Sequence, residues 1–79
     1  MKPLKINAEW DDEAAVWVAT SDDVEGLAIE ASTMDALIER LKIVIPELME
    51  ANHKAQAGDE LPFMLDGFMA HRASSNHPH

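Results

Sequence analysis

The 79-residue sequence has no cysteine, which excludes disulfide bonds, thiolate zinc sites and a thiol nucleophile. Its three glycines stand apart from one another, so no glycine-rich phosphate-binding loop is present. No stretch approaches the roughly 18 apolar residues of a membrane-spanning helix. The opening residues, MKPLKINAEW, also lack the apolar segment of a secretory signal. We therefore expect a cytoplasmic protein, and we expect no cofactor.

Basic residues are scarce as well. Six Lys and Arg stand against fifteen Asp and Glu, which gives a formal net charge of −9. A charge of this sign repels nucleic acid and anionic membranes, so we expect no direct contact with either. It suits a basic partner protein, although acids that only keep a small protein soluble are the simpler interpretation.

The length allows a single domain, and residues 1–70 carry all the structural patterns. Residues 71–79, HRASSNHPH, are polar and are expected to form a mobile tail. A chain of this size buries only about 60% of the surface that its unfolded form exposes. Self-association as a homodimer, through an open sheet face or an exposed strand edge, would add stability.

Three strands are predicted in the first half of the chain. Residues 4–10, LKINAEW, alternate between apolar and polar side chains, the pattern of a half-buried strand. Residues 15–20, AVWVAT, are rich in β-branched and aromatic side chains, and the acids at 11–13 predict a hairpin turn before them. Residues 27–31, LAIEA, predict a third short strand, which is entered after Gly26.

A helix is predicted over residues 33–53. Thr33 can cap its start, and apolar residues then recur every three or four positions as far as Leu48. Pro46 removes one hydrogen bond from a regular helix, but the apolar stripe continues in phase beyond it. We therefore predict a kinked helix rather than two helices, with Gly58 ending any last turn.

Residues 61–70, LPFMLDGFMA, permit two interpretations. Asp66-Gly67 between apolar runs is typical of a hairpin, whereas one longer strand with a glycine bulge is the interpretation that we favour. The predicted fold is α+β with the order β-β-β-α-β. It comprises a three-stranded antiparallel meander, a fourth edge strand and one kinked helix packed on one face, and it leaves the other face open.

The acidic residues concentrate in one part of the chain. Eight carboxylates and no Lys or Arg lie between Glu9 and Glu30, mostly in two predicted turns. Consecutive acids in a turn do not converge on one metal ion, so we expect no metal site and no catalytic residue. Solvated turns are the first interpretation and an acidic recognition surface is the second. A small metal-dependent hydrolase or nuclease that uses these acids is the competing function.

The histidines give no catalytic pattern either. His71, His77 and His79 lie in the predicted tail with Ser74 and Ser75, where nothing orients a nucleophile beside a base.

The two tryptophans depend on the hairpin register. If Trp10 pairs with Ala14, then Val16 and Val18 lie under the helix and Trp17 lies on the open face. A register one residue different moves Trp17 inside. An exposed Trp17 would be a typical interface anchor, whereas two buried tryptophans would fill a small core. The candidate partner-binding residues are Trp17, Glu9, Asp11, Asp22, Asp23 and Glu25.

Residues 4–52 resemble the small prokaryotic HicB-like domains, and in particular their short members with a W-D-x-E-A-x-V-W-V-A core. The pattern combines the hairpin, the glycine turn and the helix cap in that order. The matching positions are Trp10, Asp11, Glu13, Ala14, Val16, Trp17, Val18, Ala19, Asp23, Val24, Gly26, Leu27 and the IPEL run at 45–48.

The resemblance implies a truncated ribonuclease-H-like fold and the function of an antitoxin, which binds and blocks a small basic toxin that cleaves messenger RNA. Two departures stand out. The chain has no residues left for the DNA-binding module of full HicB antitoxins, and DVEGL lacks the proline that usually precedes the glycine in the larger group. No catalytic carboxylate of ribonuclease H can be matched here. An orphan, self-associating domain that has lost its toxin is a further possibility.

Overall fold

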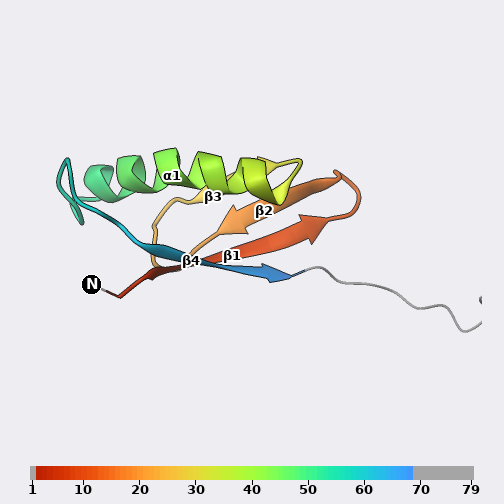
Figure 1. Cartoon of the computed structure of the whole chain (residues 1–79), viewed down its shortest axis with the longest axis horizontal. Coiled ribbons are helices and arrows are strands. Elements are labelled where there is room, and N and C mark those ends of the chain that lie inside the picture. The colour runs from red at the N-terminus through yellow and green to blue at the C-terminus, as the bar shows by residue number, and fades with distance from the viewer. Residues whose placement is uncertain (1, 69–79) are drawn as a thin grey trace, which may run out of the picture.

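The computed structural model describes residues 2–68, and the predicted tail at 71–79 lies outside the described residues. The described residues form four strands and one helix in the predicted order β-β-β-α-β (Figure 1). The α+β fold class is thereby confirmed. The elements are β1 (Leu4–Asp11), β2 (Val16–Thr20), β3 (Ala28–Ala31), α1 (Met34–Ala51) and β4 (Phe63–Phe68).

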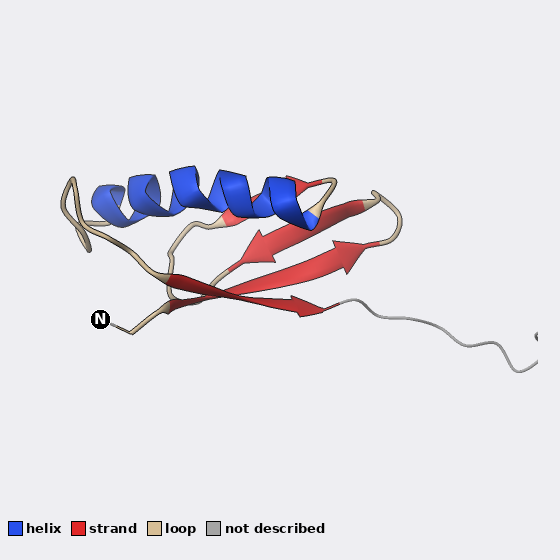
Figure 2. Cartoon of the chain, viewed as in Figure 1, coloured by secondary structure: helices blue, strands red, loops and turns tan. Residues whose placement is uncertain are grey.

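The strands form one mixed sheet in the order β3-β2-β1-β4. The pairs β1–β2 and β2–β3 are antiparallel, which confirms the predicted meander, and β4 joins the free edge of β1 in parallel. Helix α1 lies along one face of the sheet (Figure 2). Within residues 2–68 no element covers the other face, as the single-helix pattern predicts.

The core lies between α1 and the sheet. On β1 the side chains of Leu4, Ile6 and Ala8 are buried, while the residues between them are exposed, as the period of two predicts. On α1 the buried residues recur at one-turn intervals and continue past the proline. They are Leu37, Leu41, Ile45 and Met49.

The ends of α1 are set by side chains and by backbone geometry. The Thr33 hydroxyl accepts a hydrogen bond from the Ala36 amide at 3.1 Å, which confirms the predicted cap. The helix continues through Pro46 as one element, so the interpretation of two helices is wrong, whereas the bend at the proline stays a prediction. The predicted end of the helix at residue 53 agrees with the structure to within two residues, and Gly58 lies in a separate turn beyond the helix, with φ +92°. The helix closes at Asn52, and the next residue, His53, takes the left-handed conformation with φ 58°.

Residues 63–68 form one strand, which confirms the favoured interpretation, and the Asp66-Gly67 hairpin does not occur. The expected bulge at Gly67 is wrong, because the register with β1 continues residue by residue through the glycine. Gly67 keeps a strand conformation and pairs with Ala8. Pairing with β1 is favoured over the local hairpin because it packs the side chains of Phe63 and Leu65 against the core. A Cβ at Gly67 would stand 3.4 Å from the Met34 Cε, at the flexible end of that side chain.

The structure decides between the two faces that the sequence left open for Trp17. Trp10 pairs with Trp17, not with Ala14, so Trp17 lies on the helix side and Val18 lies on the open face. The cause is the turn, which takes up residues 12–15 because Ala15 adopts a left-handed conformation with φ 56°. The register that pairs Trp10 with Ala14 has a three-residue turn at 11–13, whereas the observed turn has four residues. The partner of Trp10 therefore moves by three positions, and each β2 side chain lies on the opposite face.

Candidate functional site

The acidic elbow at residues 21–27, SDDVEGL, is tied to β1 by side-chain hydrogen bonds. The Ser21 hydroxyl donates to the Lys5 carbonyl and accepts from the amides of Asp23 and Val24. The Asp23 carboxylate accepts from the Lys5 amide at 2.8 Å. Both backbone groups of Lys5 are therefore bound by the elbow, which gives Ser21 and Asp23 a structural task.

The elbow also inserts apolar side chains into the core. Val24 and Leu27 are buried on either side of Gly26, whose φ of +87° favours glycine. The Asn52 side chain, just after α1, donates to the Glu25 carbonyl at 3.0 Å. The elbow is therefore a packed corner that connects β1 to the end of the helix through these hydrogen bonds. Its three acidic side chains are exposed to solvent.

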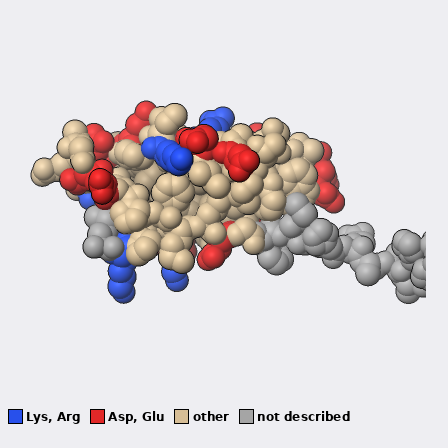
Figure 3. Space-filling model, viewed as in Figure 1, with Lys and Arg blue, Asp and Glu red and all other residues tan. Residues whose placement is uncertain are grey.

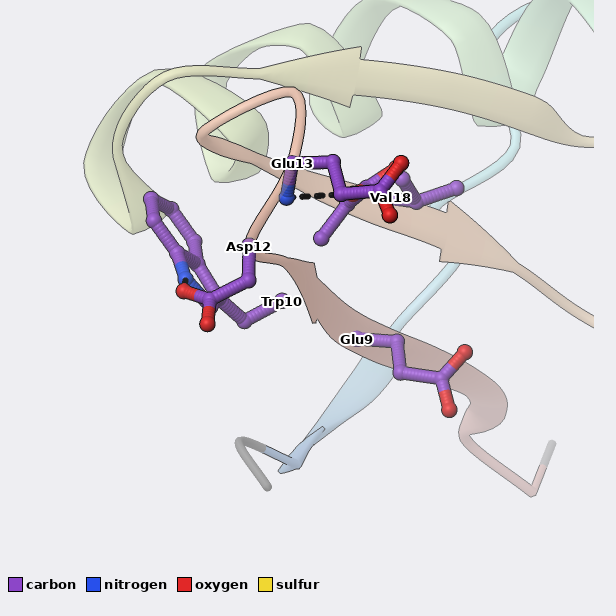
Figure 4. Close-up of a pocket in the computed structure, with 6 residues that line it drawn as sticks. Glu9, Trp10, Asp12, Glu13 and Val18 are labelled. Carbon is purple, nitrogen blue, oxygen red and sulfur yellow. Dashed lines mark hydrogen bonds between the residues drawn. The ribbon is translucent and has the colours of Figure 1, made fainter. Parts of the chain in front are cut away.

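The turn between β1 and β2 is also built by its acids. Asp11 Oδ1 accepts from the amides of Glu13 and Ala14, at 3.0 and 3.2 Å. Asp12 Oδ1 accepts from the Trp10 indole at 3.0 Å (Figure 4). These carboxylates satisfy donors that the turn would otherwise leave to water.

A shallow hollow of about 370 Å³ lies beside this turn. Figure 4 shows its lining, in which Val18 of β2 stands among acidic side chains from β1 and the turn. A second hollow of about 480 Å³ lies toward the β3 edge and shares Val18 with the first. Its lining includes Glu30 and the Arg40 side chain of the helix. Val18 is thus the point where two surface hollows meet.

Val18 lies in the middle of the open sheet face. Its partners in the register are Glu9 on β1 and Glu30 on β3. The next row toward the elbow pairs Asn7 with Thr20, and the row toward the hairpin pairs Asp11 with Val16. The open face therefore has an apolar line of two residues on β2, Val16 and Val18, with carboxylates on both flanking strands.

The candidate acids do not form one patch. Glu9 and Asp11 lie at the hairpin end of β1, whereas Asp23 is bound at Lys5 near the other end. At about 3.4 Å per residue, Lys5 and Asp11 are separated by about 20 Å along the strand. Figure 3 shows acidic side chains spread over the visible face, at both ends of the domain and between them, rather than in a single cluster.

Trp17 is half-buried and packs against the core on the helix side. Its ring meets that of Trp10 edge to face, at a centroid distance of 5.5 Å. The hypothesis that Trp17 anchors a partner on the open face is therefore wrong about the face, and its position there is taken by Val18. The interpretation of Trp17 as part of the packing is the one that the structure supports.

Sequence reasoning missed the residues that replace Trp17 on the open face. They are Val18, Glu30, Met64 and Asp66, and their placement follows from the register on both sides of β1. The signal for it was the four-residue turn, since Asp11 followed by Asp-Glu-Ala-Ala can close a loop before Val16. No group of three or more His, Asp or Glu in residues 2–68 is placed to hold a metal ion. The helix in this range does not combine the length and the apolar character needed to cross a membrane.

Fold and surface together define a small α+β domain with a one-sided core. Residues 3–75 match the family model described as "Domain of unknown function (DUF1902)", and the chain belongs to this family. A crystal structure titled as hypothetical protein TTHA1013, from the extremely thermophilic bacterium Thermus thermophilus, is similar at 45% identity and a TM-score of 0.70. The match covers 92% of this chain and 99% of that one. No curated protein matches the chain.

Proposed function

We propose that this domain is a non-enzymatic protein-binding module whose partner is a basic protein. The observation that carries the proposal is the uncovered sheet face, where an apolar line on β2 is flanked by carboxylates on β1 and β3. A surface of this composition is typical of a protein interface, with an apolar centre and a charged rim. The net charge of −9 favours a partner of the opposite sign.

The resemblance to HicB-like domains makes the proposal more specific. It rests on the hairpin and glycine-turn residues from Trp10 to Leu27 and on the order β-β-β-α-β, which the HicB-like fold shares. We propose that the domain neutralises a small basic toxin that cleaves messenger RNA. An acidic surface can occupy the site where such an enzyme binds the RNA backbone, since both present negative charge. Such a toxin acts in the cytoplasm, and the proposal places this domain there as well.

The test begins with capture of partners by the tagged full chain from native lysate at low salt. The recovered protein is then expressed in cells alone and together with this domain, and growth and messenger RNA integrity are followed. We expect a small basic protein in stoichiometric amount that degrades messenger RNA when alone and is silent in the pair.

A captured protein by itself decides nothing, because an acidic bait retains many basic proteins. The proposal fails if the captured protein leaves messenger RNA intact. It also fails if the toxic activity persists when this domain is present in excess.

A further inference from the structure

We infer that the basic partner docks on the open sheet face, centred on Val18 and flanked by Glu9 and Glu30, and not on the acidic elbow. This inference rests on the proposed function and names the surface that performs it. The inference is supported by the exposed apolar side chains of the face, by the positions of its charged side chains and by the kinds of partner that those charges would repel.

The open face carries apolar side chains that remain partly or fully exposed. Val16 and Val18 lie on β2, an interior strand of the sheet, yet both remain only half-buried because no described element covers them. Ala28 on β3 is exposed, and Met64 on β4 is 51% exposed. An apolar line of this kind on a small domain is typical of a surface that is covered by a partner.

The charges flank this line on both sides. Glu9 and Glu30 are the two register partners of Val18. Strands lie about 4.8 Å apart, so the two backbones that carry these glutamates are about 10 Å apart across Val18. A cationic side chain whose stem covers Val18 can reach either carboxylate, as arginine and lysine stems commonly pack on apolar surface.

The remaining charges of the face decide which occupant it takes. On the open side, the described residues of the four strands place the carboxylates of Glu9, Asp11, Glu30 and Asp66 against one cation, Lys5. The Arg40 side chain of α1 adds a second cation at the β3 edge, where it lines a hollow with Val18 and Glu30, so acids still outnumber bases on this surface. A second copy of this chain would oppose the same acids to themselves, which is unfavourable. Nucleic acid and an anionic membrane are excluded by the same sign of charge. A protein surface with a cationic rim and an apolar centre is complementary.

The other acidic surfaces of the domain are less suited to this task. In the elbow, Asp23 already accepts from the Lys5 amide. On the outer side of α1, Lys42 is paired with Glu39 at 3.4 Å, and the exposed Ile43 has only Pro46 as an apolar neighbour one turn away. Carboxylates without an apolar centre attract a basic partner but do not provide the dry contact that holds it.

The test uses the full chain and a defined probe, a blocked five-residue peptide of alternating arginine and leucine. Backbone amide shifts are followed by NMR at low salt during titration. We expect the largest shifts at Val16, Val18 and Glu30, with saturation at a single dissociation constant. The double variant Glu9→Gln/Glu30→Gln should bind the peptide about fivefold more weakly.

The matched control is Glu47→Gln/Glu50→Gln on the exposed side of α1, which changes the net charge by the same amount. We expect it to weaken binding by less than about twofold. The variant Val18→Thr keeps a β-branched side chain of nearly the same shape and removes its apolar character. It should weaken binding at high salt, where the carboxylates contribute least.

Equal losses in the two double variants, or shifts spread over every acidic residue, would overturn the inference, because only the net charge would then matter. Shifts confined to the elbow or to α1 would overturn it as well. These results are independent of the toxin test. If a captured toxin binds the Glu9→Gln/Glu30→Gln variant as tightly as it binds the wild type, the proposed function stays intact. That result would show that the open sheet face is not the docking site.

Discussion

Trp10 and Trp17 stand directly opposite each other on β1 and β2, with their ring planes inclined at 63°. This one pair fixes the register of the hairpin, because it places both rings on the helix side of the sheet. The same pair determines that Val18, and not Trp17, faces solvent between Glu9 and Glu30. The choice of interface residues therefore follows from an aromatic contact on the opposite face.

Replacing Trp17 with alanine should destabilise the fold. The half-buried ring loses its contact with Trp10 and with the core, at a cost of about 2–4 kcal/mol. Urea unfolding followed by circular dichroism measures this loss. An unchanged midpoint together with lost partner binding would return Trp17 to the role of an interface anchor.

Ser21→Ala should destabilise the elbow by about 1–2 kcal/mol, because the hydroxyl donates one hydrogen bond to the Lys5 carbonyl on β1 and accepts two from amides within the elbow. The control is the exposed neighbour in Asp22→Asn, which should change stability by no more than about 0.5 kcal/mol. The free energy of unfolding of both variants is measured in urea. Similar values for the two would mean that the hydroxyl does not hold the elbow.

Gly26→Ala should cost about 1 kcal/mol or more, because φ of +87° is strained for any residue with a Cβ. Gly67→Ala is the comparison, since that glycine has no positive φ and its new Cβ meets only the flexible end of Met34 at 3.4 Å. We expect the melting temperature to fall clearly in the first variant and little in the second. A reversed order would show that close packing, and not backbone conformation, selects these glycines.

Pro46→Ala should raise the melting temperature. The proline lies inside α1 and cannot donate to the Lys42 carbonyl, whereas alanine restores this bond and has the highest helix propensity. The gain is expected to be between about 1 and 3 kcal/mol, reduced by the greater freedom of the unfolded chain. Differential scanning calorimetry compares the two proteins. A lower melting temperature would indicate that a bend at Pro46 is needed to seat Ile45 and Met49 in the core.

Association with the basic partner should slow as salt rises, because rim carboxylates act mainly by steering the encounter. Between about 50 mM and about 500 mM NaCl we expect a fall of about tenfold in the association rate and a smaller change in dissociation. Stopped-flow tryptophan fluorescence can follow the reaction. A rate that does not depend on salt would mean that the acids serve solubility alone.

Local patterns in the sequence were sufficient for the elements themselves. The alternation in β1 reflects one buried and one solvent-exposed face, and the apolar stripe on α1 reflects one buried face. Each element can therefore be recognised from its own residues. The Thr33 cap likewise depends on residues within one turn. The order β-β-β-α-β and the open face follow from these local features, because one helix can cover only one side of a sheet.

The candidate site could not be predicted in the same way. Ala14 and Ala15 have no side-chain signal that separates the end of a strand from a turn, and this difference moves Trp17 and Val18 to opposite faces. The tertiary contact between the two tryptophans, and the burial of Ala19, select between the registers. The acids of the elbow posed a similar difficulty, since only the position of Lys5 alongside them reveals that Asp23 is structural.

The sequence by itself determined the elements, their order, the cap and the sign of the surface charge, because these depend on neighbours within a few residues or on composition. Only the tertiary structure decided the register of β2. It also decided that β4 pairs with β1 as one strand and does not fold into a hairpin at Gly67. Those choices compare whole packing arrangements between segments distant in the chain. The difference in free energy between two such arrangements depends on contacts between distant segments, so it cannot be judged from any short stretch of the sequence.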